Sequence, residues 1–304
     1  MTKSKLKGNL LLFLTAFIWG TSFIAQSVGM ETISPTAFIG ARCLLGSAVL
    51  LPVIFVLDKI KEKNGAVVRR ADKNLIIGGI LCGIVLFAAS TLQTAGMVYT
   101  SPGKSGFITA LYMVLIPVVR FFMGKKPSPV VILAVLVAIC GMYLLCIDEG
   151  FAVNYGDVLT FFCAMFFTVH ILVIDKFSPM VDGVKMSCMQ FFVCGIMGCI
   201  AMFFDTPSFD AAMVLSCWKP ICYSGVLSCG VAYTLQIVAQ KYTDPTSASI
   251  LMSLESVFSV LATSLLVALG WSLTGGALSA REIVGCVLMF GAIMLVQLPD
   301  FKKR

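Results

Sequence analysis

Charged side chains are scarce in this sequence. Only 12% of its 304 residues are charged and 59% are hydrophobic, whereas about a quarter of the residues in an ordinary soluble domain are charged. A soluble core cannot bury so much apolar surface. Because the scarcity of charge continues along the whole chain, it also excludes a separate soluble domain. The composition therefore predicts an integral membrane protein.

The residue types that build metal, nucleotide and catalytic sites are few or dispersed. The chain has one histidine, and most of its 12 cysteines lie inside apolar segments without the spacing of a metal site. No Gly-rich phosphate loop follows a strand pattern. The 22 Lys and Arg residues outnumber the 15 acids, but they are scattered over short loops and do not form one basic face. We therefore expect no metal, no cofactor, no catalytic residues and no nucleic-acid partner.

Long hydrophobic runs, by contrast, follow one another with short polar breaks. A helix needs about 20 mostly apolar residues to cross the hydrocarbon core. Several predicted helices start where a capping residue precedes a proline, at Ser34-Pro35, Ser101-Pro102, Ser128-Pro129 and Asp244-Pro245. The runs predict an all-α protein with ten transmembrane helices, at residues 8–27, 35–57, 75–99, 104–123, 129–147, 156–176, 185–204, 218–241, 246–270 and 281–298.

The chain also resembles itself. A shift of 143 positions aligns residues 87–114 with 230–257, including Thr-Leu-Gln at 91–93 and 234–236, and Tyr-Thr-x-Pro at 99–102 and 242–245. The repeat divides the chain into residues 1–147 and 148–304, with five helices in each half. Because five crossings reverse the side of the membrane, the two halves should be inverted, as in carriers that work by alternating access. A duplication that serves packing alone is the other interpretation.

The basic residues predict the orientation, since Lys and Arg favour the cytoplasmic side. With the N-terminus inside, nearly all of them fall on cytoplasmic segments. Only Lys104, Lys219 and Arg281 fall in outer loops, and Arg42 lies within the second helix. We expect a multi-pass protein of the cell membrane with both termini in the cytoplasm.

Several motifs, in their order and spacing, resemble the EamA family of the drug/metabolite transporter (DMT) superfamily. They are Ala-Phe-Ile-Trp-Gly-Thr-Ser-Phe at 16–23, Ala-Arg at 41–42, Thr-Ala-Leu-Tyr at 109–112 and Ser-Leu-Glu-Ser-Val-Phe-Ser-Val at 253–260. The resemblance covers nearly the whole chain and implies two EamA repeats of five helices. It also implies a carrier, since relatives move amino acids, sugars, organic cations or other metabolites. The chain departs from the family at Met113 and Ser256, where proline is usual, and at Lys125, which follows Gly124 where the family has an acid.

Polar side chains inside the predicted helices mark a candidate site, since polar groups in hydrocarbon usually face a bundle interior or a watery cavity. Several of them share a helical face, or are paired by the repeat, as Gln93 is with Gln236 and Tyr112 with Glu255. His170 occupies the repeat position of Ser22. The alternative is that these groups only bridge helices. The predicted substrate-binding residues are Trp19, Ser22, Gln26, Gln93, Tyr112, His170, Tyr233, Gln236 and Glu255.

Two charged residues inside predicted helices leave alternatives open. Burial disfavours the charged form of a carboxylate, so Glu255 is a candidate for proton coupling, against a fixed structural role. Arg42 would balance Glu255, bind an anionic solute, or extend toward the membrane surface.

The sequence thus predicts a secondary transporter that moves a small metabolite across the cytoplasmic membrane by alternating access. The solute is expected to be amino-acid-like, or another small polar or amphipathic molecule. We expect an exporter, with proton coupling as an option, acting as a monomer or homodimer in contact with membrane lipid. The alternatives are an integral membrane enzyme, for which no cluster of acid, base or metal ligands is visible, and a non-transporting scaffold, which has no need of an inverted repeat.

Overall fold

The computed structural model describes residues 3–68, 71–99, 102–146, 153–205, 211–270 and 279–297. Within these ranges every regular element is a helix, and there is no strand. The elements are α1 (Lys3–Met30), α2 (Pro35–Lys63), α3 (Lys73–Met97), α4 (Pro102–Thr109), α5 (Tyr112–Phe122), α6 (Pro129–Cys146), α7 (Tyr155–Phe177), α8 (Gly183–Asp205), α9 (Ala211–Ser216), α10 (Trp218–Cys222), η1 (Tyr223–Tyr233), α11 (Thr234–Ala239), α12 (Pro245–Met252), α13 (Leu254–Ala268) and α14 (Ala280–Gln297).

Eight helical segments among the described residues are long and apolar enough to cross a membrane. They are α1, α2, α3, the pair α4–α5, α7, α8, the run α10–η1–α11, and the pair α12–α13. The described part of α6 is a shorter apolar helix, Pro129–Leu144, and α14 occupies the last predicted segment. The prediction of an all-helical membrane protein is confirmed, whereas the count of ten spans stays a prediction. The expected boundary between residues 147 and 148 lies outside the described residues.

Local capping chemistry explains where several helices begin. Ser34 accepts the Ala37 N–H before α2, Ser128 accepts the Val131 N–H before α6, and Asp244 accepts two amides of the first turn of α12. These bonds satisfy amide groups that a helix start leaves without a partner. The predicted caps at these three positions are confirmed, and the fourth, Ser101, lies outside the described residues.

Two helices that were predicted to be continuous are interrupted, and a third changes its helix type along its length. A turn at Ala110 and Leu111 separates α4 from α5, and a turn at Ser253 separates α12 from α13. The predicted segment 218–241 runs without a break from α10 through the π-helical stretch η1 into α11. Hydropathy does not change at these points, and therefore the sequence pattern did not show the interruptions.

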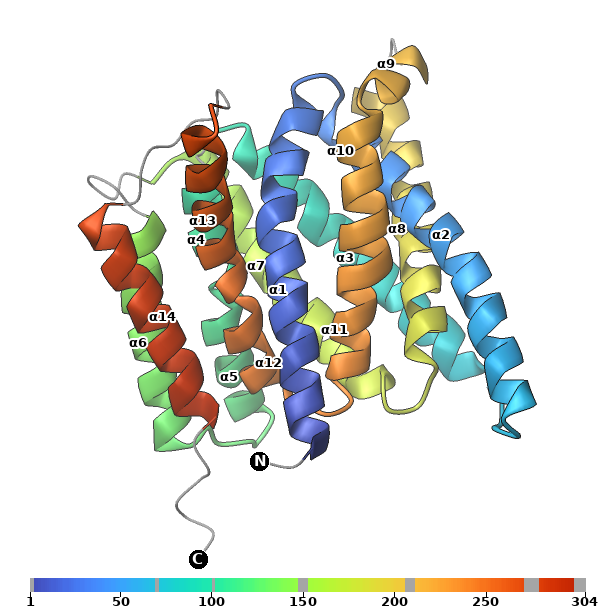
Figure 1. Cartoon of the computed structure of the whole chain (residues 1–304), viewed down its shortest axis with the longest axis horizontal. Helices are drawn as coiled ribbons and strands as arrows, with labels where there is room; N and C mark the ends of the chain where they lie inside the picture. The colour runs from blue at the N-terminus through green and yellow to red at the C-terminus, as the bar shows by residue number, and fades with distance from the viewer. Residues whose placement is uncertain are drawn as a thin grey trace, which may run out of the picture.

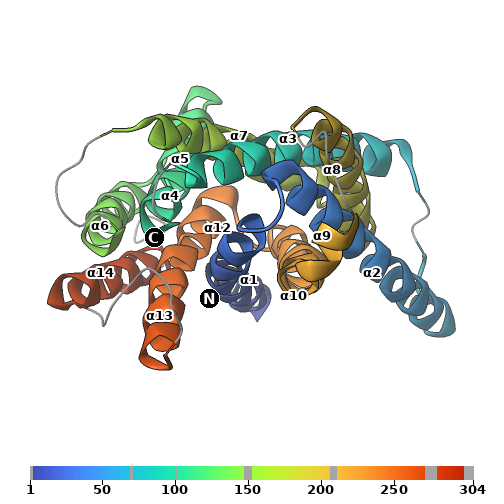
Figure 2. The same cartoon turned by 90° about the horizontal axis from the view of Figure 1, so that it is seen from above.

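The helices form one elongated bundle, with helix pairs at both ends (Figures 1 and 2). At one end α6 packs along α14, and at the other end α2 packs along α8. Between the ends, α3 packs along α7 on one long side and α1 packs against η1 and α13. The first turn of α1 and the last turn of α14 lie at the same edge of the bundle (Figure 1).

Apolar and polar side chains are distributed as expected in lipid. Large hydrophobic side chains such as Phe55 and Phe203 are exposed on the outside, whereas Gln26, Gln93 and Gln236 are buried. Water cannot satisfy polar groups in the hydrocarbon core, so they lie in the interior. The polar interior therefore marks the region where a solute would meet the protein.

Candidate functional site

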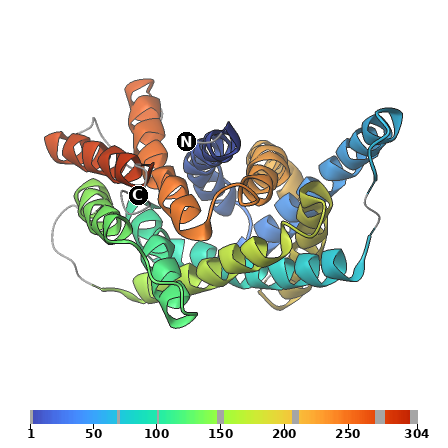
Figure 3. The ribbon, with the colours of Figure 1, turned by 90° about the horizontal axis from the view of Figure 1, so that it is seen from below.

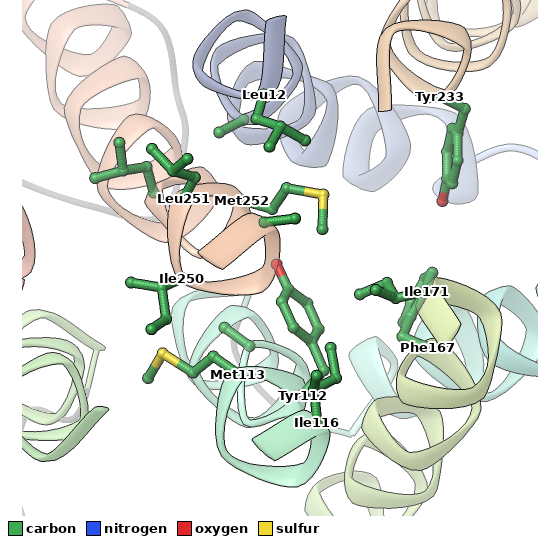
Figure 4. Close-up of a cluster of buried hydrophobic side chains, with 14 of the residues drawn as sticks. Leu12, Tyr112, Met113, Ile116, Phe167, Ile171, Tyr233, Ile250, Leu251 and Met252 are labelled. Carbon is green, nitrogen blue, oxygen red and sulfur yellow. The ribbon is translucent and has the colours of Figure 1, made fainter. Parts of the chain in front are cut away.

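A small cavity lies in the middle of the bundle, between α1, α2, α3, the two interrupted helices, α7 and η1. It has a volume of about 30 Å³. In Figure 4 the Tyr112 and Tyr233 side chains project from opposite sides toward the same space, with Phe167 and Ile171 of α7 beside it. The cavity is lined by Trp19, Phe23, Gln26, Arg42, Gln93, Thr109, Tyr112, Phe167, Ile171, Ser228, Tyr233, Gln236 and Glu255.

The two helix interruptions place residues of both halves at this cavity. Around Leu111 the backbone makes i to i+3 hydrogen bonds, from Met113 N–H to Ala110 O at 3.0 Å and from Val114 N–H to Leu111 O at 2.8 Å. At the second turn Ser256 N–H donates to Ser253 O at 3.2 Å. The backbone angles of Leu111 (φ −59°, ψ −12°) and Ser253 (φ −61°, ψ −12°) are nearly the same. Each tight turn is followed within two residues by a polar residue of the cavity, Tyr112 or Glu255.

Tyr112 and Glu255 bond directly to each other. The Tyr112 hydroxyl donates to Glu255 Oε1 at 3.0 Å, and both side chains are buried. Among the described residues no basic side chain pairs with Glu255. A carboxylate in this position is costly without a cation, so the site is suited to a cationic group or to a proton on Glu255.

Arg42 brings a positive charge to the same cavity. Its side chain is 5% exposed, and its Nη1 donates to Gln26 Oε1 at 2.8 Å. Extension toward the membrane surface is therefore wrong for this residue. Pairing with Glu255 is also wrong within the described structure, because no ion pair joins Arg42 to a carboxylate there. The geometry leaves open binding of an anionic group and a packing role, in which Arg42 bonds to Gln26 and lies 5.6 Å from the centre of the Phe38 ring.

The repeat-related amides Gln93 and Gln236 both line the cavity but are bonded differently. Gln93 Nε2 donates to the Thr109 hydroxyl at 3.3 Å, whereas the buried Gln236 Oε1 has no protein partner. Trp19 Nε1 and Arg42 Nε are also buried without a partner among the residues that the structure describes. Buried polar atoms are nearly always hydrogen-bonded, so these three atoms are available to a polar solute.

Aromatic rings form one wall of the cavity. The rings of Trp19 and Tyr233 lie 4.5 Å apart between centroids, and Phe191 packs edge-on against Tyr233 at 5.4 Å. Tyr233 is the last residue of η1, and π-helical turns often occur at functional sites. The wall thus combines apolar faces with a hydroxyl and an indole N–H.

The structure brings together seven of the nine predicted site residues in the cavity lining: Trp19, Gln26, Gln93, Tyr112, Tyr233, Gln236 and Glu255. Ser22 and His170 are fully buried but do not line it. His170 lies behind Tyr233, with ring centroids 6.0 Å apart, and its Nε2 bonds to Gln190 Oε1 at 3.0 Å. Their role in binding stays a prediction.

Sequence reasoning left out several lining residues. Arg42 was considered but not placed in the site, Thr109 was noted only within the motif at 109–112, and Ser228 was not considered. The apolar members Phe23, Phe167 and Ile171 had no signal in the sequence, because they are indistinguishable there from core residues. Among the described residues no group of three His, Cys, Asp or Glu side chains could hold a metal ion.

Comparison with known proteins defines the class to which this helical bundle and its polar centre belong. The EamA-like transporter family pattern matches residues 6–147 and, a second time, residues 154–298. The chain belongs to the EamA-like transporter family, and hence to the DMT superfamily.

Individual relatives agree with this assignment. An uncharacterized transporter of Archaeoglobus fulgidus is 30% identical over 259 residues, which cover 84% of this chain and 77% of the relative. The uncharacterized transporter YoaV of Bacillus subtilis is 18% identical over 283 residues, covering 91% and 92%. A solved crystal structure shares the fold, with a TM-score of 0.73 at 20% identity over 95% of this chain and 96% of the other.

Proposed function

We propose that this protein is a secondary transporter that carries a small metabolite across the cell membrane by alternating access. The observation that carries the proposal is the central cavity, where two interrupted helices present Tyr112 and Glu255 beside buried polar atoms that have no protein partner. Interrupted helices at mid-membrane are the usual sites of solute binding in transporters, because their free backbone and side-chain groups face a protected space.

The proposed mechanism requires two inverted repeats of five helices, and three observations support them. The family pattern matches the chain twice. The turns at Ala110 and Ser253 are 143 residues apart, which is the shift of the internal repeat. Tyr112 and Glu255, also 143 residues apart, touch each other. Equivalent residues of two halves meet only near the axis that relates the halves, so the Tyr112–Glu255 pair lies at the proposed pseudo-two-fold axis.

The small volume of the cavity is that expected for a closed state of a transporter. A volume of about 30 Å³ has room for about one or two water molecules and is too small for a metabolite. Transport therefore requires the lining helices to separate, first on one side of the membrane and then on the other. The inverted halves provide two such openings by exchanging conformations.

An amino-acid-like solute fits the charges best. Arg42 and Glu255 both line the cavity without pairing with each other, so a solute with a carboxylate and an ammonium group can satisfy both. A bidentate guanidinium contact suits a carboxylate, and Glu255 with Tyr112 suits a cation. We propose that both termini are cytoplasmic, since nearly all basic residues then lie on the cytoplasmic side. Export from the cytoplasm is the direction that we propose for transport.

Substitution of Gln93 and Gln236, the two amides that the repeat pairs, tests the proposed site. Full-length protein in proteoliposomes should show solute-dependent flux, and Gln93→Ala and Gln236→Ala should each raise the half-saturating solute concentration about fivefold or more, since each removes about 1 kcal/mol of polar contact. Gln240→Ala is the matched control, because Gln240 is buried on a neighbouring turn but lies outside the cavity lining. Unchanged flux in both amide variants, at normal expression, would exclude the paired role.

Proton coupling through Glu255 has its own test. Flux of the wild type should depend on an imposed pH gradient, and Glu255→Gln should abolish this dependence, because an amide holds no exchangeable charge. Glu282→Gln, which changes an acid near the start of α14, is the control and should keep the gradient dependence. If Glu255→Gln transports as fast as the wild type, with the same response to pH, the coupling hypothesis fails.

A further inference from the structure

A basic pocket opens at the membrane edge where α1 begins and α14 ends, the edge that faces the viewer in Figure 3. It has a volume of about 340 Å³ and is lined by one acid, Asp244, and four basic residues. Asp244 pairs with Arg120 at 3.0 Å, so the charge of Arg120 is balanced within the pocket. The other basic residues of the lining are Lys5 and the two exposed lysines Lys125 and Lys126. The excess of positive charge attracts an anion.

The start of α6 adds to this attraction. Ser128, Val130 and Val131 of its first turn line the pocket, and the N-terminus of an 18-residue helix carries a partial positive charge. Arg120 also donates to the Thr246 hydroxyl at 3.1 Å, which holds the guanidinium at the pocket wall. The pocket thus combines exposed lysine charges with a guanidinium that is held in place and a helix terminus, the elements of a phosphate site.

An apolar groove of about 380 Å³ continues from the pocket between α5 and α6. Pro117, Pro127 and Val131 line both the pocket and the groove. Every other residue of the groove is also apolar, and two of them, Phe122 and Leu136, are 82% and 55% exposed on the outer surface. A groove of this kind on the lipid-facing surface suits a hydrocarbon chain.

We propose that the pocket and the groove together bind one anionic phospholipid, with its phosphate in the basic pocket and one acyl chain in the groove. A water-soluble phosphate would leave the groove unused, and a neutral lipid would make no use of the exposed charges of Lys125 and Lys126, so the continuity of the two features favours an anionic lipid. This binding site is separate from the transport cavity and stands whether or not the proposed solute is correct.

Binding is measured on the purified full-length protein in detergent by native mass spectrometry, with phosphatidylglycerol, phosphatidylcholine of the same acyl chains, and glycerol 3-phosphate. Phosphatidylglycerol should bind at least tenfold more tightly than phosphatidylcholine, and glycerol 3-phosphate should not displace it. The double variant Lys125→Gln, Lys126→Gln should weaken phosphatidylglycerol binding about thirtyfold, since each basic residue near an anionic lipid contributes about a fivefold change in affinity. The double variant Lys59→Gln, Lys63→Gln removes two exposed lysines outside the pocket and should not weaken it.

The groove has a matched pair of variants on one helix. Leu136 lines the groove, and Leu133 of the same helix does not, although the two are similarly exposed, at 55% and 50%. Leu136→Trp should fill the groove and weaken phosphatidylglycerol binding about tenfold, whereas Leu133→Trp should leave it unchanged. All these side chains are exposed, so unchanged melting temperatures should accompany the variants.

Three results would overturn the proposal. Equal binding of phosphatidylglycerol and phosphatidylcholine would show a general lipid contact. Displacement of phosphatidylglycerol by equimolar glycerol 3-phosphate would show a site for a soluble phosphate. Equal weakening by the two lysine double variants would show attraction to the whole membrane edge and no defined site.

Discussion

Gly20 determines how closely α1 approaches the helix that carries Glu255. A Cβ atom at this position would lie 2.6 Å from the Glu255 carbonyl oxygen and 2.9 Å from the Ser259 nitrogen. Both are backbone atoms, which cannot turn aside as the end of a side chain can. The short interhelical distance at the site therefore depends on the absence of a side chain at residue 20.

Gly20→Ala should destabilise the protein by about 1–3 kcal/mol, the usual cost of overpacking a core. It should also slow transport, because the added methyl group changes the packing of α1 against α13 beside the proposed site. The measurements are thermal unfolding in detergent and flux in proteoliposomes. Gly291→Ala is the control, since a Cβ at Gly291 meets nothing within 4 Å and alanine favours the helix by about 0.5–1 kcal/mol. Equal stability of the two variants would contradict this account.

Seven of the predicted residues line the cavity, because the repeat paired several of them and helical spacing put others on one face. The sequence did not identify Arg42 as a site residue. The depth of a long side chain depends on packing, here on the bond to Gln26 and the close approach of Gly46 to the η1 backbone. Ser22 was placed on the right helix but does not reach the cavity, since the spacing of residues does not define how a helix is rotated.

The interrupted helix α12–α13 has a side-chain bond at its turn. The Ser253 hydroxyl donates to the Ile250 carbonyl at 2.8 Å, a carbonyl that a continuous helix would pair with a backbone N–H. One turn earlier, the Ser249 hydroxyl makes the same kind of bond to Thr246 O at 2.8 Å. Only Ser253 lies at the interruption.

Ser253→Ala and Ser249→Ala should each lower stability by about 1 kcal/mol, the net contribution of one hydrogen bond. Only Ser253→Ala should also reduce transport, because it alters the turn that positions Glu255. Thermal unfolding and flux assays on both variants separate the two effects. Loss of transport in both variants, or in neither, would show that the turn has no special role.

The interruptions themselves could not be predicted from the sequence. The residues at the turns, Ala110, Leu111 and Ser253, are compatible with a helix, and the runs remain apolar through them. At these turns the backbone hydrogen bonds change from i+4 to i+3 partners. This change depends on how the neighbouring helices pack, and hydropathy carries no information about that packing. The first residues of α2, α6 and α12 were predictable because Ser or Asp before Pro is a local signal for the start of a helix.

The two halves are joined at one edge of the bundle by an ion-pair network between α2 and the start of α8. Lys61 bonds to Asp182 at 2.5 Å, and Lys185 pairs with Asp58 at 2.7 Å. Partial burial alone would raise the pKa of Asp182, but the hydrogen bond and charge of Lys61, with the Val184 and Lys185 amides, outweigh it and lower the pKa of this carboxyl. The network thus favours the ionised form of Asp182 in the folded protein.

A carboxyl whose pKa is lower in the folded protein than in the unfolded chain stabilises the folded state. This stabilisation is complete when the pH is above the pKa of the unfolded chain, about 3.9, and it is lost as the pH falls through the pKa of the folded protein. The wild type should therefore be more stable than Asp182→Asn at pH 7, and the difference should shrink progressively as the pH falls below about 5. Melting temperatures from pH 7 to pH 3 measure this. Asp72→Asn, which also removes a helix-capping carboxylate, is the control. A difference that grows toward low pH would contradict the assignment.

On the scale of the whole molecule, the pair formed by Tyr112 and Glu255 has a consequence for the evolution of the chain. If two equivalent halves exchange shapes, a contact on their common axis is the same in both states, and it favours neither the inward-open nor the outward-open form. Under the proposed exchange, selection on this pair would act on solute and proton binding without shifting the balance between the states. After such a duplication, one member can become a phenol and the other an acid, so that a symmetric scaffold has a chemically one-sided centre.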